Sequence, residues 1–117
     1  MTAATLEHTY SARQAATKAG VTYRQIDYWI RNGVTIGDGD NGGSGSRRSF
    51  TDGDVAVLRF VGRFTPIVGR PDSVMPVIRR VVARLAADPS ILDRPLVFIG
   101  LDGTISEHPV HGWVVQP

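Results

Sequence analysis

The sequence of 117 residues predicts a mainly α-helical fold with a small β part, and three observations lead to this prediction. Capping-box patterns, which start helices, occur twice near the N-terminus. Apolar residues recur at helical spacing after these patterns and in two later segments, and the period changes to that of strands near the C-terminus. Apolar residues make up 42% of the chain and charged residues 21%, a balance that is typical of a globular domain and argues against disorder.

A short helix is predicted to begin after Ser11. Ser11 and Gln14 have the spacing of a capping box, in which each side chain binds the backbone N–H of the other residue. We expect a helix of about eight residues, ended by Gly20 in the left-handed conformation. The residues expected to face inward are Ala12, Ala15 and Ala16.

A second helix is predicted from Tyr23 to about Asn32, because Thr22 and Gln25 form a second capping box before it. Gly33 is expected to end it. At 100° per residue, one side of this helix is apolar and the other side carries charge and an aromatic hydroxyl. The expected buried residues are Ile26, Trp29 and Ile30. The expected solvent-facing residues are Arg24, Tyr28 and Arg31, with Asp27 beside them.

Residues 35–49 are rich in Gly, Asp and Ser and have no apolar periodicity, so they predict a mobile loop. This loop ends in the basic pair Arg47 and Arg48. Two longer amphipathic helices are expected after it, over residues 52–64 and 73–87, with Pro66 breaking the first. Thr51 and Asp54 have the spacing of another helix start, and the expected apolar face of the first helix comprises Val57, Leu58, Phe60, Val61 and Phe64. The expected apolar face of the second helix, opposite Arg79, Arg80 and Arg84, comprises Val74, Val77, Ile78, Val81, Val82 and Leu85.

The C-terminal segment is predicted to form strands. Residues 96–101 are a β-rich run, and Asp102-Gly103 is the dipeptide of a two-residue type I′ hairpin turn. Residues 104–106 would return as the second strand, and residues 113–115 would add a third. An isolated hairpin is marginal in water, so we expect this one to pack on the helices or on another subunit.

Two short helices joined by a turn at Gly20, the second of them capped and bearing cations, are typical of a helix-turn-helix. In such a motif the second helix enters the major groove of DNA. Arg24 is placed to bind guanine in bidentate fashion, and Tyr28 and Arg31 are placed for phosphates or sugars. The basic loop then has the position of a wing that grips the backbone or the minor groove. Packed helical proteins without a nucleic-acid role also contain this geometry.

Positive charge is concentrated in the first half of the chain. Residues 1–64 carry eight Lys and Arg against six Asp and Glu, whereas residues 65–117 carry five of each kind. Attraction to polyanions must therefore arise in the first half. Twelve of the thirteen cations are arginine, which suits bidentate contacts with phosphate or guanine, although a GC-rich genome would give the same bias.

Residues 10–64 resemble the MerR-like winged helix-turn-helix family. The matching stretches are Tyr10–Ala16, Gly20–Val34 and Gly45–Val55. Within them, Thr22–Trp29 and Gly43–Arg47 look most like actinobacterial regulators of the FtsR-like group. The resemblance covers about half of the chain and implies a winged helix-turn-helix, followed here by a helix and a C-terminal β-hairpin.

The resemblance implies DNA contacts from the second helix, at Arg24 and Tyr28, and from the wing, at Arg48 with Arg47 beside it. The whole predicted DNA-binding set comprises Arg13, Thr22, Tyr23, Arg24, Tyr28, Arg31, Arg47 and Arg48. One departure concerns Asp27, where many members have arginine. A carboxylate repels phosphate, but it can accept a hydrogen bond from cytosine or orient Arg24 or Arg31.

The domain division expected is a flexible N-terminus at 1–9, the DNA-binding domain at 10–64, and a packing or dimerisation element at 65–117. About 50 residues follow the first amphipathic helix, too few for a large ligand-binding domain. The expected partners are double-stranded DNA, a second copy of the chain, and RNA polymerase or another protein through the C-terminal part. The expected source is an actinobacterium or one of its phages.

Several function classes are not expected. The chain has no cysteine, which excludes disulfides, thiolate metal sites and cysteine nucleophiles. His108 and His111 lie in an extended segment without further ligands, so no metal or cofactor is expected. No catalytic motif has supporting context, so no enzymatic activity is expected. Without an 18-residue apolar run or a secretion leader, a cytoplasmic, nucleoid-associated protein is expected.

Two alternatives to a dimeric transcriptional regulator remain. The first is an excisionase-like, architectural or DNA-packaging protein that binds repeated sites side by side and bends DNA. The second is a protein-interaction module whose helix-turn-helix has lost DNA binding. Asp27 and the low net charge of +2 favour this second alternative.

Overall fold

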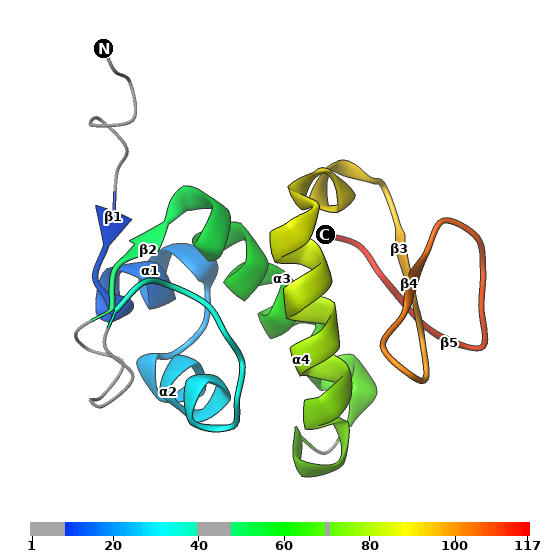
Figure 1. Cartoon of the computed structure of the whole chain (residues 1–117), viewed down its shortest axis with the longest axis horizontal. Helices are drawn as coiled ribbons and strands as arrows, with labels where there is room; N and C mark the ends of the chain where they lie inside the picture. The colour runs from blue at the N-terminus through cyan, green and yellow to red at the C-terminus, as the bar shows by residue number, and fades with distance from the viewer. Residues whose placement is uncertain (1–8, 40–47, 70) are drawn as a thin grey trace.

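The computed structural model describes residues 9–39, 48–69 and 71–117. In chain order the elements are β1 (Thr9–Tyr10), α1 (Ala12–Ala19), α2 (Tyr23–Arg31), β2 (Phe50–Thr51), α3 (Asp52–Val68), α4 (Pro71–Ala87), the 3-10 helix η3 (Pro89–Asp93), β3 (Val97–Gly100), β4 (Ile105–Ser106) and β5 (Gly112–Val115). Helices α3 and α4 form the middle of the molecule, between α1 and α2 at one end and a three-stranded sheet at the other (Figure 1). The prediction of a mainly α fold with a small β part is confirmed.

Both short helices begin where their capping boxes predict. Ser11 and Gln14 exchange hydrogen bonds of 2.9 and 3.2 Å at the start of α1, and Gly20 ends this helix with φ of 76°. Thr22 and Gln25 form the corresponding pair at the start of α2, with bonds of 2.9 and 3.0 Å. These contacts join residues only three positions apart, which explains why the sequence alone predicts them.

The segment between α2 and α3 is paired at both of its ends, so the prediction of one mobile loop over 35–49 is wrong for these ends. Ile36 is buried, and Asp38 and Ser49 exchange two backbone hydrogen bonds of 2.8 Å in an antiparallel bridge. Its central part, residues 40–47, lies outside the described residues. The apolar side chain at 36 anchors the chain to the core although no periodic pattern surrounds it.

Strands β1 and β2 pair in antiparallel fashion, with Thr9 opposite Thr51 and Tyr10 opposite Phe50. Thr9 therefore belongs to the folded part rather than to the expected flexible N-terminus. The Tyr10 hydroxyl donates a 2.8 Å hydrogen bond to Asp52, which ties β1 to the start of α3. Residues 1–8 lie outside the described residues.

Helix α3 carries the core of the molecule. Its buried face is the predicted one, including the fully buried Phe60 and Phe64. The prediction that Pro66 breaks this helix is wrong, because the helix continues through Pro66 to Val68. Proline removes one backbone donor, but near the end of a helix whose apolar face is already packed this loss does not stop the helix.

Helix α4 packs against α3 through the predicted apolar face. The buried residues on this face are Val74, Met75, Val77, Ile78, Val81, Val82 and Leu85. The helix starts at Pro71, two residues before the predicted start, and Asp88 follows its end. The short helix η3 then places the buried Ile91 in the same core, an element that the sequence pattern did not predict.

The C-terminal sheet has the strand order β4-β3-β5, and all pairs are antiparallel. The predicted two-residue type I′ turn is wrong. Asp102 does not have positive φ, whereas Gly103 has φ of 89°. The Gly103 N–H donates to the carbonyl of Gly100, and the Gly100 N–H donates to the carbonyl of Thr104. These two bonds enclose a three-residue loop, 101–103, whose last residue is glycine. A two-residue loop would have required positive φ at the non-glycine residue as well.

The sheet packs on the helices, one of the two outcomes expected. Trp113 of β5 meets Phe64 of α3 edge to face, with ring centroids 5.7 Å apart at 80°. Val97, Ile99 and Val115 are buried on the same face. The helix-turn-helix and the C-terminal sheet thus share one hydrophobic core. No helix in 9–39, 48–69 or 71–117 is both long and apolar enough to cross a bilayer.

Candidate nucleic-acid interface

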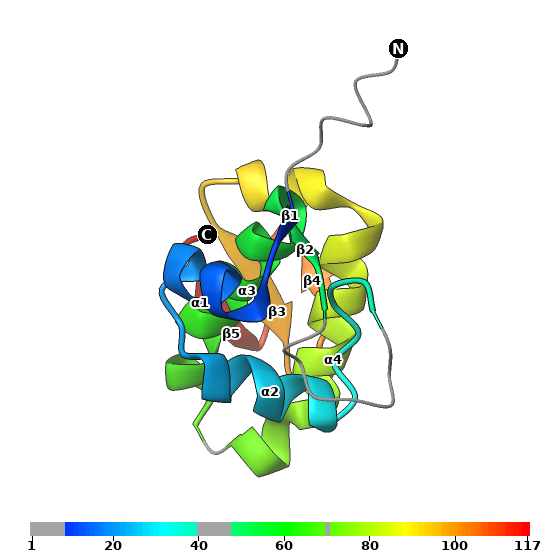
Figure 2. The same cartoon turned by 90° about the vertical axis from the view of Figure 1, so that its left-hand side faces the viewer.

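Helix α2 lies at the end of the molecule that is remote from the three-stranded sheet (Figure 1), and it faces the viewer in Figure 2. Ile26 and Trp29 are buried, with exposed fractions of 0 and 3%, and they fix which side of the helix faces outward. Ile30 is only half-buried, so the buried stripe is narrower than predicted. Arg24, Gln25 and Arg31 are exposed. The outward face of α2 therefore presents polar donors to solvent, as the helical angles predict.

The N-terminal end of α2 is organised by its own side chains and by one contact from α1. Thr22 accepts from the Gln25 N–H, so its hydroxyl oxygen serves the helix start. The guanidinium carbon of Arg13 lies 4.7 Å from the centre of the Tyr23 ring, in a cation–π contact. The structure thus brings together three of the predicted site residues at this end of the helix.

Asp27 and Arg31 form an ion pair across one turn of α2, with 2.8 Å between the carboxylate Oδ2 and Nε. The Asp27 side chain is 23% exposed and that of Arg31 is 71% exposed. The carboxylate of Asp27 therefore lies closer to the protein interior, and the guanidinium of Arg31 extends into solvent. Of the roles considered for Asp27, this geometry corresponds to orienting Arg31.

Tyr28 does not stand out in solvent, and this part of the predicted solvent face is wrong. Its side chain is half-buried and packs against the core. It lines a shallow hollow together with Arg24, Trp29 and Thr65, the last of which comes from α3. The helical angle placed Tyr28 opposite the apolar stripe, but its side chain packs against the core and is partly buried.

The described part of the basic loop between α2 and α3 comprises its two ends. Arg48 is half-buried, and its Nη1 donates to the carbonyl of Ile36 at 3.4 Å. This bond joins the strands that enter and leave the loop, beside the bridge between Asp38 and Ser49. Arg48 thus has a structural contact that its position in the sequence did not predict. Arg47 lies outside the described residues.

The comparisons with known proteins agree with this geometry. A family model described as "MerR HTH family regulatory protein" matches residues 10–69, slightly more than half of the chain. The chain belongs to the MerR family. The matched residues include α1, α2 and all of α3.

Relatives of this MerR-family chain occur in mycobacteria. Over 55 residues it is 40% identical to proteins of Mycobacterium tuberculosis and Mycobacterium bovis that are described as uncharacterized HTH-type transcriptional regulators. The match covers 46% of this chain and 24% of each relative. The chain thus spans about a quarter of the length of these relatives. No solved structure matches it at a significant level.

One contact to α2 comes from outside the MerR-matched residues. Arg79 of α4 donates from Nη1 to the carbonyl of Asn32, at the C-terminal end of α2, over 2.9 Å. The sequence placed Arg79 on the exposed face of its helix, which is correct, but no local pattern indicates its partner 47 residues earlier.

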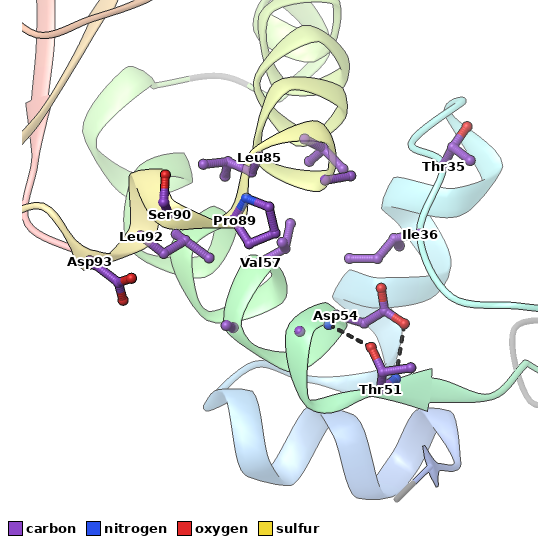
Figure 3. A pocket seen from close by; sticks show the side chains of 14 residues that line it. Thr35, Ile36, Thr51, Asp54, Val57, Leu85, Pro89, Ser90, Leu92 and Asp93 are labelled. Atoms are coloured by element: carbon purple, nitrogen blue, oxygen red, sulfur yellow. Dashed lines mark hydrogen bonds between the residues drawn. The ribbon is translucent and has the colours of Figure 1, made fainter. Parts of the chain in front are cut away.

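A cavity of about 570 Å³ lies between the start of α3, the end of α4 and η3, with Thr35 and Ile36 also in its wall (Figure 3). Val57, Leu85 and Leu92 contribute to its mainly apolar wall, and among the described residues no Lys or Arg lines it. Thr51 and Asp54, also in its wall, are bonded to each other as the cap of α3. None of the described α2 residues lines this cavity.

Proposed function

We propose that this MerR-family chain is a sequence-specific, DNA-binding transcriptional regulator whose helix α2 enters the major groove. The outward face of α2 carries the proposal. Its position is fixed by buried Ile26 and Trp29, while Arg24 and Gln25 project near the capped N-terminal end. An arginine can bind two guanine acceptors at once, whereas the Gln25 side-chain oxygen accepts from the Thr22 N–H in the cap of α2. We place its action on chromosomal DNA in the cytoplasm.

Phosphate contacts are proposed on either side of this reading face. Arg31 is oriented by Asp27 but keeps most of its surface in solvent. Arg13, stacked on Tyr23, is exposed beside the start of α2. Arginine contacts to phosphates fix the register of a protein on DNA without reading the bases. The wing, with Arg47 and Arg48, is proposed to hold the flanking backbone.

A homodimer is proposed through the C-terminal sheet. Phe98 and Val114 are cross-strand partners on β3 and β5, on the face opposite to buried Val97 and Ile99. Val114 is 49% exposed, and Leu96, which precedes β3, is 47% exposed. A second copy would cover these apolar side chains, and a two-fold dimer would present two copies of α2 to a palindromic site.

The test is selection of bound duplexes from a randomised DNA library by the purified protein at near-physiological salt. We expect enrichment of an inverted repeat whose half-sites are separated by a whole number of helical turns. Direct repeats would instead favour the architectural or excisionase-like alternative. Binding that never exceeds a salt-sensitive, sequence-independent background would contradict sequence-specific recognition.

A further inference from the structure

Arg79 makes two contacts with the segment that ends α2. Its Nη1 donates to the carbonyl oxygen of Asn32 over 2.9 Å. Its side-chain stem lies against Gly33, because a Cβ added at Gly33 would lie 2.9 Å from Cδ of Arg79. The guanidinium and its stem therefore both engage the point at which the chain leaves the helix.

This contact completes a C-terminal cap that is otherwise local. Asn32 donates from its backbone and its side chain to the carbonyl of Tyr28, at 3.1 and 2.7 Å. The carbonyl of Trp29 accepts from Val34, and that of Ile30 accepts from Gly33. The carbonyl of Asn32 is bound instead by a cation from another helix, which also suits the negative end of the helix dipole.

Helix α4, which carries Arg79, is itself held in place by packing in the core. Its opposite face is buried, with Ile78 and Val81 fully enclosed in the core. The next residue, Arg80, donates to the carbonyl of Asp102 at 3.1 Å, in the turn of the C-terminal hairpin. Neighbouring arginines on one turn of α4 thus hold the end of α2 and the turn of the sheet.

We infer that Arg79 is a positioning residue for DNA recognition, fixing the C-terminal end of α2 and with it the direction in which Arg24 and Arg31 are presented. The inference rests on the proposed function and extends it beyond the MerR-matched residues. A side-chain contact with a base depends on the orientation of the whole helix, whereas a phosphate contact tolerates more movement. Loss of Arg79 therefore lowers discrimination between sequences more than it lowers general affinity.

The test compares Arg79→Met, Arg79→Lys and Arg80→Met. Methionine keeps much of the stem against Gly33 but removes the donor, whereas lysine keeps a donor and the charge. Arg80→Met removes the same charge from the adjacent position and leaves the end of α2 untouched. Affinity is measured for the selected duplex and for a scrambled duplex of equal length, at several salt concentrations. Thermal unfolding of each variant is measured in parallel.

For Arg79→Met we expect the ratio of the two affinities to fall about tenfold, the effect of one misaligned base contact. Affinity for the scrambled duplex and the salt slope stay near those of the wild type. Arg79→Lys restores most of the ratio, and Arg80→Met leaves it unchanged. An equal loss on both duplexes, with a salt slope lower by about 1, would instead make Arg79 a direct phosphate contact and overturn the inference.

Amide hydrogen exchange at Gly33 and Val34 separates this inference from the proposed function. If Arg79 fixes the end of α2, these amides exchange faster in Arg79→Met and return towards wild type in Arg79→Lys. Specific DNA binding by the wild type with an unchanged ratio in Arg79→Met overturns the inference alone. If Arg79→Met exchanges faster but the wild-type protein selects no DNA sequence, the proposed function and the recognition role of Arg79 are both wrong. Only the role of Arg79 in capping α2 then remains. If Arg79→Met does not fold, Arg79→Gln is used instead, because the glutamine side chain is too short to reach the carbonyl of Asn32.

Discussion

Gly62 of α3 lies against Val21, the residue that follows the turn of the helix-turn-helix. A Cβ added at Gly62 would lie 2.5 Å from Cγ1 of Val21. The turn therefore rests directly on the backbone of α3, at a separation that only glycine allows. The angle between the helix-turn-helix and the central helix depends on this contact.

Replacing Gly62 by alanine should destabilise the protein. In an open helix the same change gains about 1 kcal/mol, but forcing a methyl group into a packed contact costs about 1–3 kcal/mol. We expect a net loss of up to about 2 kcal/mol, measured by urea unfolding. Gly53→Ala is the matched control in the same helix, because its nearest neighbour would be Thr51 Oγ1 at 3.6 Å. Equal effects from both substitutions would show that the contact with Val21 is unimportant.

Arg24→Ala should relax specificity at one base pair of the site, at a cost of about 1–3 kcal/mol in discrimination.

Arg48→Ala should weaken binding to all sequences alike and reduce the salt slope by about 1. Both are measured by titration of duplexes that differ at single positions. Arg84→Ala is the control, since Arg84 pairs with Asp88 at the end of α4. A uniform loss in Arg24→Ala would exclude a base-reading role for this arginine.

Asp102 should make the C-terminal hairpin sensitive to acid. The Thr104 N–H donates to its carboxylate at 2.9 Å, and this bond lowers the pKa of Asp102, with the Arg80 charge acting in the same direction. A carboxyl group whose pKa is lower in the folded state stabilises that state at pH values above the ordinary pKa of 3.8. That contribution is lost as the pH falls through the folded-state pKa.

Melting temperatures of wild type and Asp102→Asn measure this effect. The wild type should melt higher at pH 7, and the difference should shrink as the pH falls below about 3.8 and through the lowered folded-state pKa of Asp102. Ser106→Ala, on the neighbouring strand, is a control without a titrating group. A difference that stays constant with pH would mean that the geometry of the turn, rather than the charge, is what Asp102 contributes.

Val114→Lys should dissociate the proposed homodimer. The substitution places a charge at the centre of the outer apolar face, and we expect the dimer dissociation constant to rise at least about tenfold. Sedimentation equilibrium gives the association state. Thr104→Lys adds the same charge at an exposed position in the hairpin turn and should have little effect. A wild-type protein that sediments as a monomer throughout would refute dimerisation through this face.

The sequence could predict those parts of the fold that depend on neighbouring residues. The starts of α1, α2 and α3 follow from caps that span three positions. The buried faces of α3 and α4 follow from helical period. Pro66 was misjudged because a local rule for helix breaking was outweighed by packing along the rest of α3. The turn at Gly103 was misjudged because one dipeptide fits two loop lengths.

The candidate site divides in the same way. The exposure of Arg24 and Arg31 follows from the helical angle, and the Asp27–Arg31 pair joins residues one turn apart. The half-burial of Tyr28 arises from packing on the core, the structural contact of Arg48 from Ile36, and the cap by Arg79 from α4. These partners are distant in sequence, so no spacing rule could reveal them.

The edge-to-face contact between Phe64 and Trp113 also constrains when the protein can fold as it is made. Trp113 and Val115 are translated about 50 residues after Phe64, yet they complete the core around α3. A nascent chain that has emerged only as far as Val68 holds the entire helix-turn-helix but leaves Phe60 and Phe64 uncovered on one side. The helix-turn-helix should therefore reach its stable form only after β5 has emerged and packs on α3.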